Sequence, residues 1–269
     1  MISIVTICYN ERNTINRTIR SVYSQTRTDY EYIIKDALSD DGTAEELKKW
    51  EEPFRKKGIS FKVISAKDKG IYDGMNLAVA ECSGDYVNFM NAGDEFFSED
   101  VLEKIFADGS LNDADLIYGD ALEEEFGELH YFRKCPELIR ERMPFSHQSV
   151  FVKRELLLKY PFRLKYRIAA DYDLLLTLDE KGYDFRDSGV IVAKISKSGK
   201  SSVKLKDTYI ESLKLRRDHG IGVPEGEALK RKLFWINIKQ FGMDHFPKGL
   251  KYVIRKVQRK MRGQKSYGQ

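Results

Sequence analysis

The sequence lacks the features that mark several large classes of protein. It has only three cysteines, Cys8, Cys82 and Cys135, which are widely spaced and form no CxxC pattern. This odd, scattered set excludes a disulfide scaffold and predicts free thiols in a reducing compartment. No apolar run approaches the roughly 18 residues of a membrane-spanning helix, which excludes a polytopic membrane protein. The counts of 19 Gly and 6 Pro are ordinary and exclude collagen-like and low-complexity chains.

Fingerprints of several nucleotide-dependent enzymes and hydrolases are missing as well. No GxGxxG follows the first apolar run and no GxxxxGK[ST] occurs, which argues against a dinucleotide-binding dehydrogenase and a P-loop kinase. No GxSxG nucleophile elbow is present, and the histidines have no close metal-ligand spacing. The N-terminus enters an apolar run without a basic region or a cleavage site. We therefore expect no signal peptide and a cytoplasmic protein.

The composition is that of a globular chain with unevenly distributed charge. The 269 residues are 42% hydrophobic and 33% charged, include 15 Phe and 15 Tyr, and have a mean hydropathy of −0.49. A chain of this length buries roughly 70–75% of its unfolded surface and forms one or two domains. The net charge is +4, but residues 1–198 carry 28 Lys and Arg against 36 Asp and Glu, whereas residues 199–269 carry 18 against 6. We expect the basic segment to meet an anionic surface.

The first half of the chain alternates between strand-length apolar runs and segments of helical periodicity. This alternation predicts an α/β fold, with a mostly parallel central sheet, flanking helices and a ligand site beyond the carboxyl ends of the strands. The expected strands are Ile2–Cys8, Glu31–Asp36, Phe61–Ser65, Asp85–Met90 and Leu116–Tyr118. The expected helices are Thr14–Gln25, Thr43–Lys57, Tyr72–Ala80 and Val101–Ala107.

The second half is less regular and ends in net-basic helices. The polar stretch Lys197–Ser202 marks the best boundary, and it divides the chain into a domain at 1–198 and a basic helical C-terminal segment at 199–269. The expected strands of this half are Ser149–Val152 and Val190–Ile195. The expected helices are Asp171–Lys181, Asp207–His219, Glu225–Phe241 and Gly249–Arg262.

Polar side chains follow four of the expected strands. Tyr9–Glu11 follows the first strand, Asp36 ends the second, Asp68 follows the third, and the turn Asn91–Asp94 follows the fourth. An aromatic ring and carboxylates at this edge suit a base and its ribose. A carboxylate in a turn of small residues beside phosphates is a hard-oxygen ligand for a divalent metal. Each segment alone can also be explained as a helix cap or a turn.

Taken in order, four blocks resemble the nucleotide-binding half of the family 2 inverting glycosyltransferases with the GT-A fold, of the bacterial polysaccharide type. The blocks are Val5–Glu11 (VTICYNE), Ser39–Thr43 (SDDGT), Asp68–Asn76 (DKGIYDGMN) and Ser83–Asp94 (SGDYVNFMNAGD). The resemblance covers residues 1–195 approximately, and the ordered set is far more specific than any one block. It implies that residues 1–120 bind a nucleotide sugar and residues 121–198 face the acceptor.

The resemblance also implies roles for individual residues on the donor side. Asp94 would be the last residue of the metal-binding DxD motif and would bind Mn²⁺ or Mg²⁺. The first Asp of that motif is Asn91 in this chain, which could touch the ribose or a metal-bound water, so the choice of metal stays open. The residues expected to hold the nucleoside or line its pocket are Thr6, Tyr9, Glu11, Asp36, Asp68 and Asn76.

The second half would then supply the acceptor side. Asp171 resembles the catalytic Asp that ends a family motif, and it would act as the general base. An N-cap for the following helix is the alternative explanation, and both can hold because a helix N-terminus stabilises a carboxylate. Pro144–Ser149 resembles a loop that the family places against the acceptor or the metal. Its His147 and the nearby Asp173 are weaker candidates for the acceptor side.

These expectations describe an inverting glycosyltransferase in polysaccharide synthesis. It would move a sugar from a nucleoside-diphosphate sugar, with a UDP-sugar favoured, to a hydroxyl of a glycan or lipid-linked acceptor. The alternative is a catalytically weak nucleotide-sugar binding or scaffold protein, which only the altered DxD supports. A sugar nucleotidyltransferase would need a Gly-rich signature near the N-terminus, and none is present.

The end of the chain combines basic residues with an apolar stripe. Eight Lys and Arg lie between residues 248 and 265 with no acid among them. Interfacial helices carry such a stripe, whereas nucleic-acid-binding helices rarely do. We therefore expect peripheral attachment to the cytoplasmic face of an anionic membrane and no nucleic-acid partner. A basic helix packed on the catalytic domain is the alternative. The members of the stripe are Leu250, Val253, Ile254, Val257 and Met261.

Overall fold

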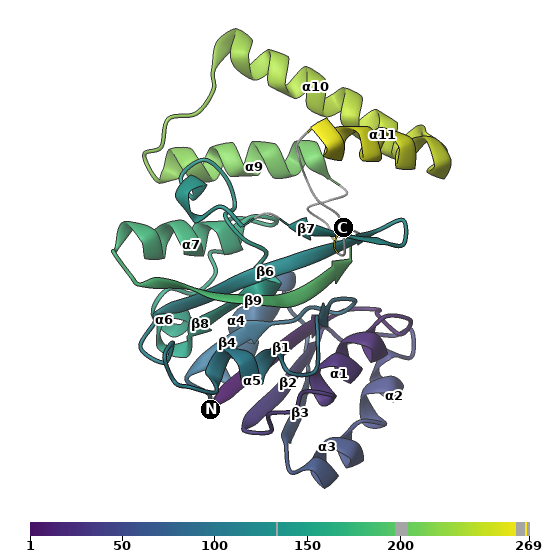
Figure 1. The fold of residues 1–269 in the computed structure, drawn as a ribbon, viewed down its shortest axis with the longest axis vertical. Helices are drawn as coiled ribbons and strands as arrows, with labels where there is room; N and C mark the ends of the chain where they lie inside the picture. Colours follow the sequence, from purple (N-terminus) through teal and green to yellow (C-terminus); the bar gives the residue numbers. More distant parts are fainter. Residues whose placement is uncertain (133, 197–203, 262–266, 268–269) are drawn as a thin grey trace.

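The first half of the chain forms four parallel strands in the order β3-β2-β1-β4. A computed structural model describes residues 1–132, 134–196, 204–261 and 267 (Figure 1). All residues of β1, β2 and β4 are buried, because helices cover both faces of this part of the sheet. The register pairs Cys8 with Asp36 and Asp36 with Ser65, so the carboxyl ends of three strands lie side by side. The bounds are β1 (Ile2–Cys8), β2 (Tyr30–Asp36), β3 (Ser60–Ser65) and β4 (Tyr86–Phe89).

Five helices accompany these strands, and their apolar faces explain their positions. In α1 the residues Ile15, Ile19 and Val22 are buried at helical spacing, against the face of the sheet that carries Ile4 and Ile34. The opposite face is covered by α4. The bounds are α1 (Ile15–Tyr23), α2 (Thr43–Lys48), α3 (Glu51–Lys57), α4 (Ile71–Ala80) and α5 (Val101–Phe106).

The second half extends the sheet with antiparallel and parallel pairs. Strand β8 pairs antiparallel with β4 and with β6, and β9 runs parallel to β6. The predicted α/β class is confirmed, but the nine-stranded sheet as a whole is mixed rather than mostly parallel. The strands are β5 (Glu95–Phe96), β6 (Leu116–Glu125), β7 (Glu128–Phe132), β8 (Val150–Lys153) and β9 (Phe185–Ser196). The helical pieces between them are η1 (Pro136–Leu138), η2 (His147–Ser149), α6 (Arg154–Lys159) and α7 (Ala170–Glu180).

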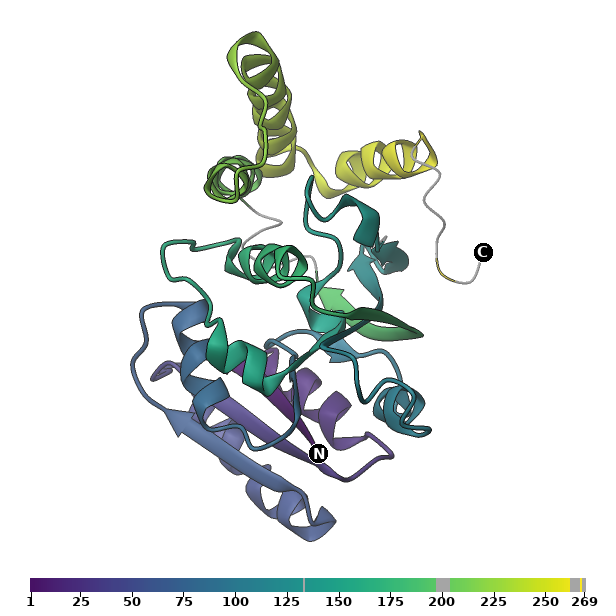
Figure 2. The same ribbon diagram turned by 90° about the vertical axis from the view of Figure 1, so that its left-hand side faces the viewer.

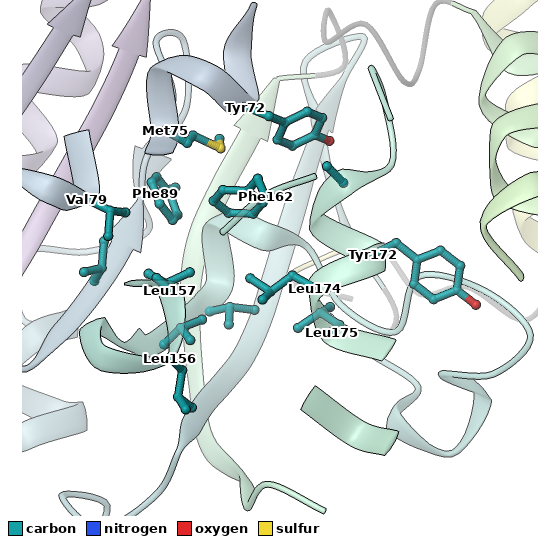
Figure 3. Close-up of a cluster of buried hydrophobic side chains, with 14 of the residues drawn as sticks. Tyr72, Met75, Val79, Phe89, Leu156, Leu157, Phe162, Tyr172, Leu174 and Leu175 are labelled. Carbon is teal, nitrogen blue, oxygen red and sulfur yellow. The ribbon is translucent and has the colours of Figure 1, made fainter. Parts of the chain in front are cut away.

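Two apolar cores lie on the two faces of the sheet. One joins α1, α2, α3 and α5 to the sheet, and the other joins α4, α6 and α7 to it. Figure 3 shows part of the second core, where Met75 and Phe89 face Phe162 and where Leu174 and Leu175 approach from α7. This core fixes α7 against the carboxyl ends of the parallel strands, which is where the candidate site lies.

The C-terminal helices lie beyond α7. They are α9 (Leu205–Asp218), α10 (Gly226–His245) and α11 (Lys248–Met261). Figures 1 and 2 show α10 and α11 at the end of the molecule opposite to α3. Leu213 and Leu215 of α9 are buried, whereas α10 has no buried residue. The boundary predicted at Lys197–Ser202 lies outside the described residues. Within the described chain, no helix combines the length and the apolar character needed to cross a membrane.

Candidate active site

A cleft of about 1880 Å³ lies at the carboxyl ends of β1 and β4, and residues of α7, α9 and α10 line its other side. Four predicted site residues, Thr6, Asp36, Asn76 and Asp173, do not line it. The cleft gathers the other predicted donor-side and acceptor-side residues in one place. These are Tyr9, Glu11, Asp68, Asn91, Asp94, His147 and Asp171.

Two loops that follow β1 and β2 hold Tyr9 and Glu11 at the cleft. Asn10, which lies between them, has a left-handed backbone (φ 57°), a conformation that Asn tolerates better than most residues. Its Nδ2 donates to Oδ1 of Asp40 at 2.9 Å, and the N–H of Asp40 donates to its Oδ1 at 3.1 Å. The N–H of Asn10 also donates to Oγ of Ser39 at 2.9 Å. This clasp leaves the Tyr9 ring 59% exposed, where it can stack on an aromatic base.

Asp36 at the end of β2 orders the second of these loops. Its carboxylate is 1% exposed and accepts the N–H of Ser39 at 3.1 Å and the thiol of Cys8 at 3.6 Å. Burial, together with the negative charge of Asp36, raises the pKa of the Cys8 thiol. The cysteine is therefore protonated at neutral pH and is no nucleophile. Asp36 acts on the cleft through the loop rather than by direct exposure.

Asp68 is fixed by a lysine that is wholly buried. Nζ of Lys35 lies 3.0 Å from Oδ2 of Asp68, and it also donates to the carbonyl oxygens of Asp36 and Ala66. The other carboxylate oxygen of Asp68 accepts the N–H of Gly70 at 3.0 Å. A buried cation needs such a set of acceptors to offset its lost hydration. Lys35 thereby ties the ends of β2 and β3 together and holds the Asp68 carboxylate at the cleft.

Two residues predicted to bind the donor have their polar groups engaged behind the cleft wall. The hydroxyl of Thr6 is wholly buried, 2.8 Å from the hydroxyl of Tyr32, and donates to the carbonyl of Met90 at 2.6 Å. The amide of Asn76 forms two 2.9 Å hydrogen bonds with the backbone of Phe162. In this structure both side chains support the wall and do not face the cleft.

Asp94 ends the turn after β4 and faces the cleft from a buried position. Its Oδ2 accepts Nε2 of Gln148 at 2.6 Å, and its Oδ1 accepts the N–H of Ser196 at 2.9 Å. Burial raises the pKa of Asp94, and the two hydrogen bonds oppose this effect only in part. Within the described chain Asp94 has no ion-pair partner. A buried carboxylate in this state is a favourable ligand for a cation.

A chain of polar contacts joins the turn of Asp94 to Asp171. Nε2 of His147 lies 2.8 Å from Nδ2 of Asn91, and its Nδ1 lies 3.3 Å from Oδ2 of Asp171. Because the Asn91 amide nitrogen is a donor, Nε2 accepts and Nδ1 carries the ring proton. The next residue, Gln148, binds Asp94. The short helix η2 therefore bridges the candidate metal ligand and the candidate base.

Asp171 lies in the first turn of α7, where the helix N-terminus favours a carboxylate. Its Oδ1 accepts the hydroxyl of Tyr72 at 3.1 Å and the N–H of Tyr172 at 2.9 Å. Burial and the charge of Asp171 raise the pKa of Tyr72 well above its ordinary value, so its phenol remains a donor. The segment before α7 is held by Glu211 of α9, which accepts the N–H groups of residues 167–169 at 2.6–3.0 Å.

Asp173 is buried behind the cleft and belongs to an ion-pair cluster. Its carboxylate is bound by the Arg163 guanidinium, and Nε2 of His219 lies 3.0 Å from its Oδ1. His219 in turn lies 2.9 Å from Glu180 at the end of α7. The cluster joins both ends of α7 to α9, which is a structural task and leaves Asp171 as the carboxylate of α7 that lines the cleft.

A divalent cation fits the turn that carries Asn91 and Asp94. Among the described residues, no group of three or more His, Cys, Asp or Glu side chains forms a metal cage. A cage is not required, since Mg²⁺ at phosphate sites is commonly held by one or two carboxylates and by the substrate's own phosphate oxygens. Oδ1 of Asn91 is buried without a hydrogen-bond partner, and Asp94 has a raised pKa. A bound cation would give Oδ1 of Asn91 a partner and would stabilise the charged form of Asp94.

The sequence assigned no role to three residues that hold the carboxylates of the site. Lys35, Tyr72 and Gln148 each contact one of the predicted carboxylates. A signal for Lys35 was present, because a lysine inside an otherwise apolar strand must find acceptors. Gln148 follows His147 directly in the loop already singled out. Tyr72 lies in the block Asp68–Asn76, but its contact with Asp171, 99 residues away in sequence, depends on the fold.

Comparisons with known proteins identify the family and the fold of the chain. The model of the family described as "Glycosyl transferase family 2" matches residues 3–173. A "PGL/p-HBAD biosynthesis glycosyltransferase" of Mycobacterium bovis (strain BCG / Pasteur 1173P2) is 28% identical over 179 residues, covering 64% of this chain and 67% of that protein. A glycosyltransferase of Bacillus subtilis (strain 168), named for teichuronic acid biosynthesis, is 32% identical over 104 residues, covering 39% of this chain and 40% of that protein.

Solved structures share the fold at low sequence identity. Residues 1–349 of S. aureus TarS in complex with UDP superpose with a TM-score of 0.62 at 17% identity, covering 86% of this chain and 69% of that one. The mannosyltransferase PcManGT from Pyrobaculum calidifontis, in complex with GDP-Man and Mn²⁺, gives a TM-score of 0.65 at 15% identity, covering 96% and 80%. The predicted GT-A fold is thereby confirmed.

Proposed function

The chain belongs to glycosyl transferase family 2, and from this premise we propose that it transfers a sugar from a nucleoside-diphosphate sugar to an acceptor hydroxyl, with inversion at the anomeric carbon. The observation that carries this proposal is the shared cleft, which Asp94 and Asp171 line together. His147 contacts Asp171 and Gln148 contacts Asp94, so the two carboxylates are held in one framework. Two carboxylates with separate tasks suit a single displacement that needs no covalent intermediate.

A UDP-sugar is the donor that we favour, and a glycan or a lipid-linked glycan is the acceptor class. The TarS structure contains UDP, and the PcManGT structure contains GDP-Man with Mn²⁺. Two relatives carry names that refer to PGL/p-HBAD and teichuronic acid biosynthesis. These facts support a sugar nucleotide as donor and a glycoconjugate or polysaccharide as product.

The donor side of the proposal assigns the nucleoside to the loops after β1, β2 and β3. Tyr9 would stack on the base, and the carboxylates of Glu11 and Asp68 would accept hydroxyl or base N–H groups. Asp36 would contribute to donor binding indirectly, because it orders the loop whose Ser39 accepts the N–H of Asn10. For Thr6 and Asn76 the proposal is likewise an indirect one, since their polar groups brace the wall.

Asp94 with Asn91 would hold Mn²⁺ or Mg²⁺, which when bound stabilises the negative charge that develops on the leaving diphosphate. Gln148 and the N–H of Ser196 fix the two oxygens of Asp94, so the carboxylate needs no reorientation on loading. Asn91 would contribute Oδ1, which has no other hydrogen-bond partner among the described residues. Its Nδ2 remains on His147.

Asp171 would take the proton of the acceptor hydroxyl as its oxygen attacks the anomeric carbon. The new C–O bond forms on the face opposite to the diphosphate, which leaves with the bonding electron pair. Tyr72 donates to one oxygen of Asp171 and Nδ1 of His147 lies 3.3 Å from the other, so the two side chains position the carboxylate and leave lone pairs for the incoming proton. The buried phenol of Tyr72 shields one side of the carboxylate from water.

The competing proposal is a catalytically weak protein that binds nucleotide sugars, and the altered DxD favours it. The test is incubation with UDP-, GDP- and dTDP-sugars with and without Mn²⁺, and the readout is the release of free nucleoside diphosphate. We expect Mn²⁺-dependent release from one donor type and its loss in Asp94→Ala. Asp108→Ala, which alters an exposed surface carboxylate, is the matched control. Donor binding without any release would favour the binding protein.

We further propose that residues 1–198 form the transferase domain and that the C-terminal segment attaches it to the cytoplasmic face of an anionic membrane. Three apolar residues of α11 support this attachment: Leu250, Val253 and Val257 are 46%, 54% and 53% exposed. They recur at helical spacing and form one stripe. The helix has no acidic residue, and this combination suits an interfacial helix.

A further inference from the structure

One side of the cleft contains cationic side chains that lack acidic partners. Two belong to loops, at positions 142 and 167, and three belong to α9 and α10. In the part of the chain that the structure describes, none of the five forms an ion pair. Like charges that line one cleft repel each other, and an anion relieves that repulsion. We call this set the cationic wall; its members are Arg142, Arg167, Arg216, Arg231 and Lys232.

Arg216 is the member of the cationic wall that most clearly lacks a hydrogen-bond acceptor. Its Nη2 donates to the carbonyl of Gly222 at 2.9 Å, but its Nε is buried and has no hydrogen-bond partner among the described residues. A buried donor without an acceptor costs about 1–3 kcal/mol relative to a paired one. Such a guanidinium on the lining of a cleft favours a ligand that brings acceptor oxygens.

An exposed apolar stripe runs along α10 beside the cationic wall. Phe234, Trp235, Ile238 and Phe241 are 59%, 61%, 47% and 57% exposed. Positions 234, 238 and 241 follow the i, i+4, i+7 spacing of one helical face, and Trp235 lies next to them and also lines the cleft. Four large apolar side chains on one exposed helix face form an interaction surface. We call them the α10 stripe.

We propose that the cationic wall and the α10 stripe together bind the acceptor, and that this acceptor is an amphiphile with a phosphate or diphosphate next to its apolar chain. The proposal rests on the proposed transferase function and names the acceptor class of the same cleft. Arginine and lysine pair with phosphate oxygens by charge-assisted hydrogen bonds. The apolar chain would leave the cleft along α10 and cover Trp235.

The donor's own diphosphate does not account for this surface. The proposed donor site lies at Asp94, on the turn after β4. Arg216, Arg231 and Lys232 belong to the C-terminal helices α9 and α10, which lie beyond the family match at residues 3–173. A neutral glycan acceptor could pack on the aromatic rings, but it would leave the positive charges of the cationic wall unneutralised. An amphiphilic phosphate uses both.

Trp235 provides the means to test the proposal. The chain has two tryptophans, and the other, Trp50, donates to Oδ1 of Asn16 far from this surface, so Trp50→Phe leaves Trp235 as the only reporter. The full chain in EDTA is titrated with farnesyl diphosphate, farnesol and inorganic diphosphate. We expect farnesyl diphosphate to bind best and to shift the emission to shorter wavelength as the farnesyl chain covers the indole. Inorganic diphosphate should bind more weakly and without this shift.

Two variants separate the cationic wall from the rest of the site. Arg231→Ala/Lys232→Ala should lose about tenfold or more in affinity for farnesyl diphosphate, because charge-assisted hydrogen bonds are lost. Lys230→Ala is the matched control, since Lys230 is exposed, pairs with Glu227 and does not line the cleft. Asp94→Ala should bind farnesyl diphosphate unchanged even though it fails with the sugar donor.

The outcomes that overturn the proposal are distinct from failure of the proposed function. Equal affinity of the double variant and the parent would remove the cationic wall as the phosphate site. Farnesol binding as tightly as farnesyl diphosphate would leave an apolar surface only. Inorganic diphosphate binding as tightly would leave an anion site without a lipid. Loss of farnesyl diphosphate binding in Asp94→Ala would place the probe in the donor site. A failed donor assay alone would leave these titrations intact.

Discussion

At the scale of single residues, the site depends on two neighbours that face different carboxylates. His147 contacts Asp171, and Gln148 contacts Asp94. Their side chains leave adjacent positions of η2, so a shift of this short helix moves both contacts together. One short helix therefore contacts both Asp94 and Asp171, although these carboxylates belong to segments far apart in the sequence.

The sequence predicted the carboxylates of the site better than the groups that hold them. Asp94 and Asp171 each belong to a local motif that a reader can find without a structure. Lys35 and Tyr72 contact Asp68 and Asp171 only because the fold brings distant strands and helices together. The direction of a side chain on a fully buried strand is equally a tertiary property, which explains why Thr6 points behind the wall.

The first prediction concerns Asp171 as the general base. General-base assistance contributes about 10²–10⁴-fold to rate, so we expect Asp171→Asn to lower kcat by about that factor. Donor affinity should stay near that of the parent, because Asp171 does not contact the donor-side residues directly. Steady-state kinetics and a donor titration measure the two quantities.

Asn at position 171 keeps the size of the side chain and an oxygen that can accept from Tyr72 and from the N–H of Tyr172. Its melting temperature should therefore match that of the parent, which separates the catalytic role from a helix-capping role. Near-normal transfer by a well-folded Asp171→Asn variant would mean that another group takes the proton, with His147 as the next candidate.

The second prediction follows from the raised pKa of Asp94, which burial causes. The folded state binds this proton more tightly than the unfolded state does, so the contribution to stability is full at low pH. It is lost as pH rises through the window above the unfolded pKa of about 3.9. At pH 7 in EDTA, Asp94→Asn should therefore melt at a higher temperature than the parent. The difference should vanish near pH 3.5.

A divalent cation supplies the control for this experiment. Mn²⁺ should raise the melting temperature of the parent at pH 7, because the ligand binds the folded state only. It should leave Asp94→Asn nearly unchanged. A variant that is less stable than the parent at neutral pH in EDTA would show that hydrogen bonding, rather than burial, dominates at Asp94.

At the scale of elements, periodicity predicted the regular strands and helices, and long-range pairing decided the rest. The expected helix Thr43–Lys57 is split into α2 and α3. Pro53 explains the break, because proline has no N–H and clashes with the carbonyl four residues earlier. The two-residue strand β5 and the hairpin of β6 with β7 were missed, as was α6. The strands are short or polar and form through their partners in the sheet, and α6 is a helix of only six residues that buries Leu156 and Leu157.

The third prediction concerns the way α9 positions α7. Glu211 of α9 accepts three consecutive backbone N–H groups just before α7. Glu211→Ala would leave these donors unpaired and should lower the free energy of unfolding by about 1–3 kcal/mol. The displaced Asp171 should lower kcat by up to about 10²-fold. Asp207→Ala, an exposed change on the same helix, is the control, and Glu211→Gln should restore part of both losses.

At the scale of the whole molecule, the chain separates an acidic body from a basic end. Helix α11 is attached to the body by its polar side, since the hydroxyl of Tyr252 donates to Glu128 at 2.8 Å and Arg255 lies 3.4 Å from Glu125. The two interpretations of the tail are therefore compatible: the helix packs on the β6–β7 hairpin by one side and leaves an apolar stripe exposed on another.

The last prediction tests that exposed side. Each basic residue near an anionic leaflet contributes on the order of 1 kcal/mol, and the exposed stripe of α11 adds apolar contact. The full chain should sediment with vesicles that contain anionic lipid, less so as salt rises, and not with neutral vesicles. Val253→Asp/Val257→Asp should abolish sedimentation, because two charges replace the centre of the stripe. Lys56→Gln, on α3 at the far end of the molecule, should have no effect (Figure 1).

Sedimentation that is insensitive to salt and to the Val253→Asp/Val257→Asp change would contradict attachment through α11. It would leave the α10 stripe as the membrane-facing surface.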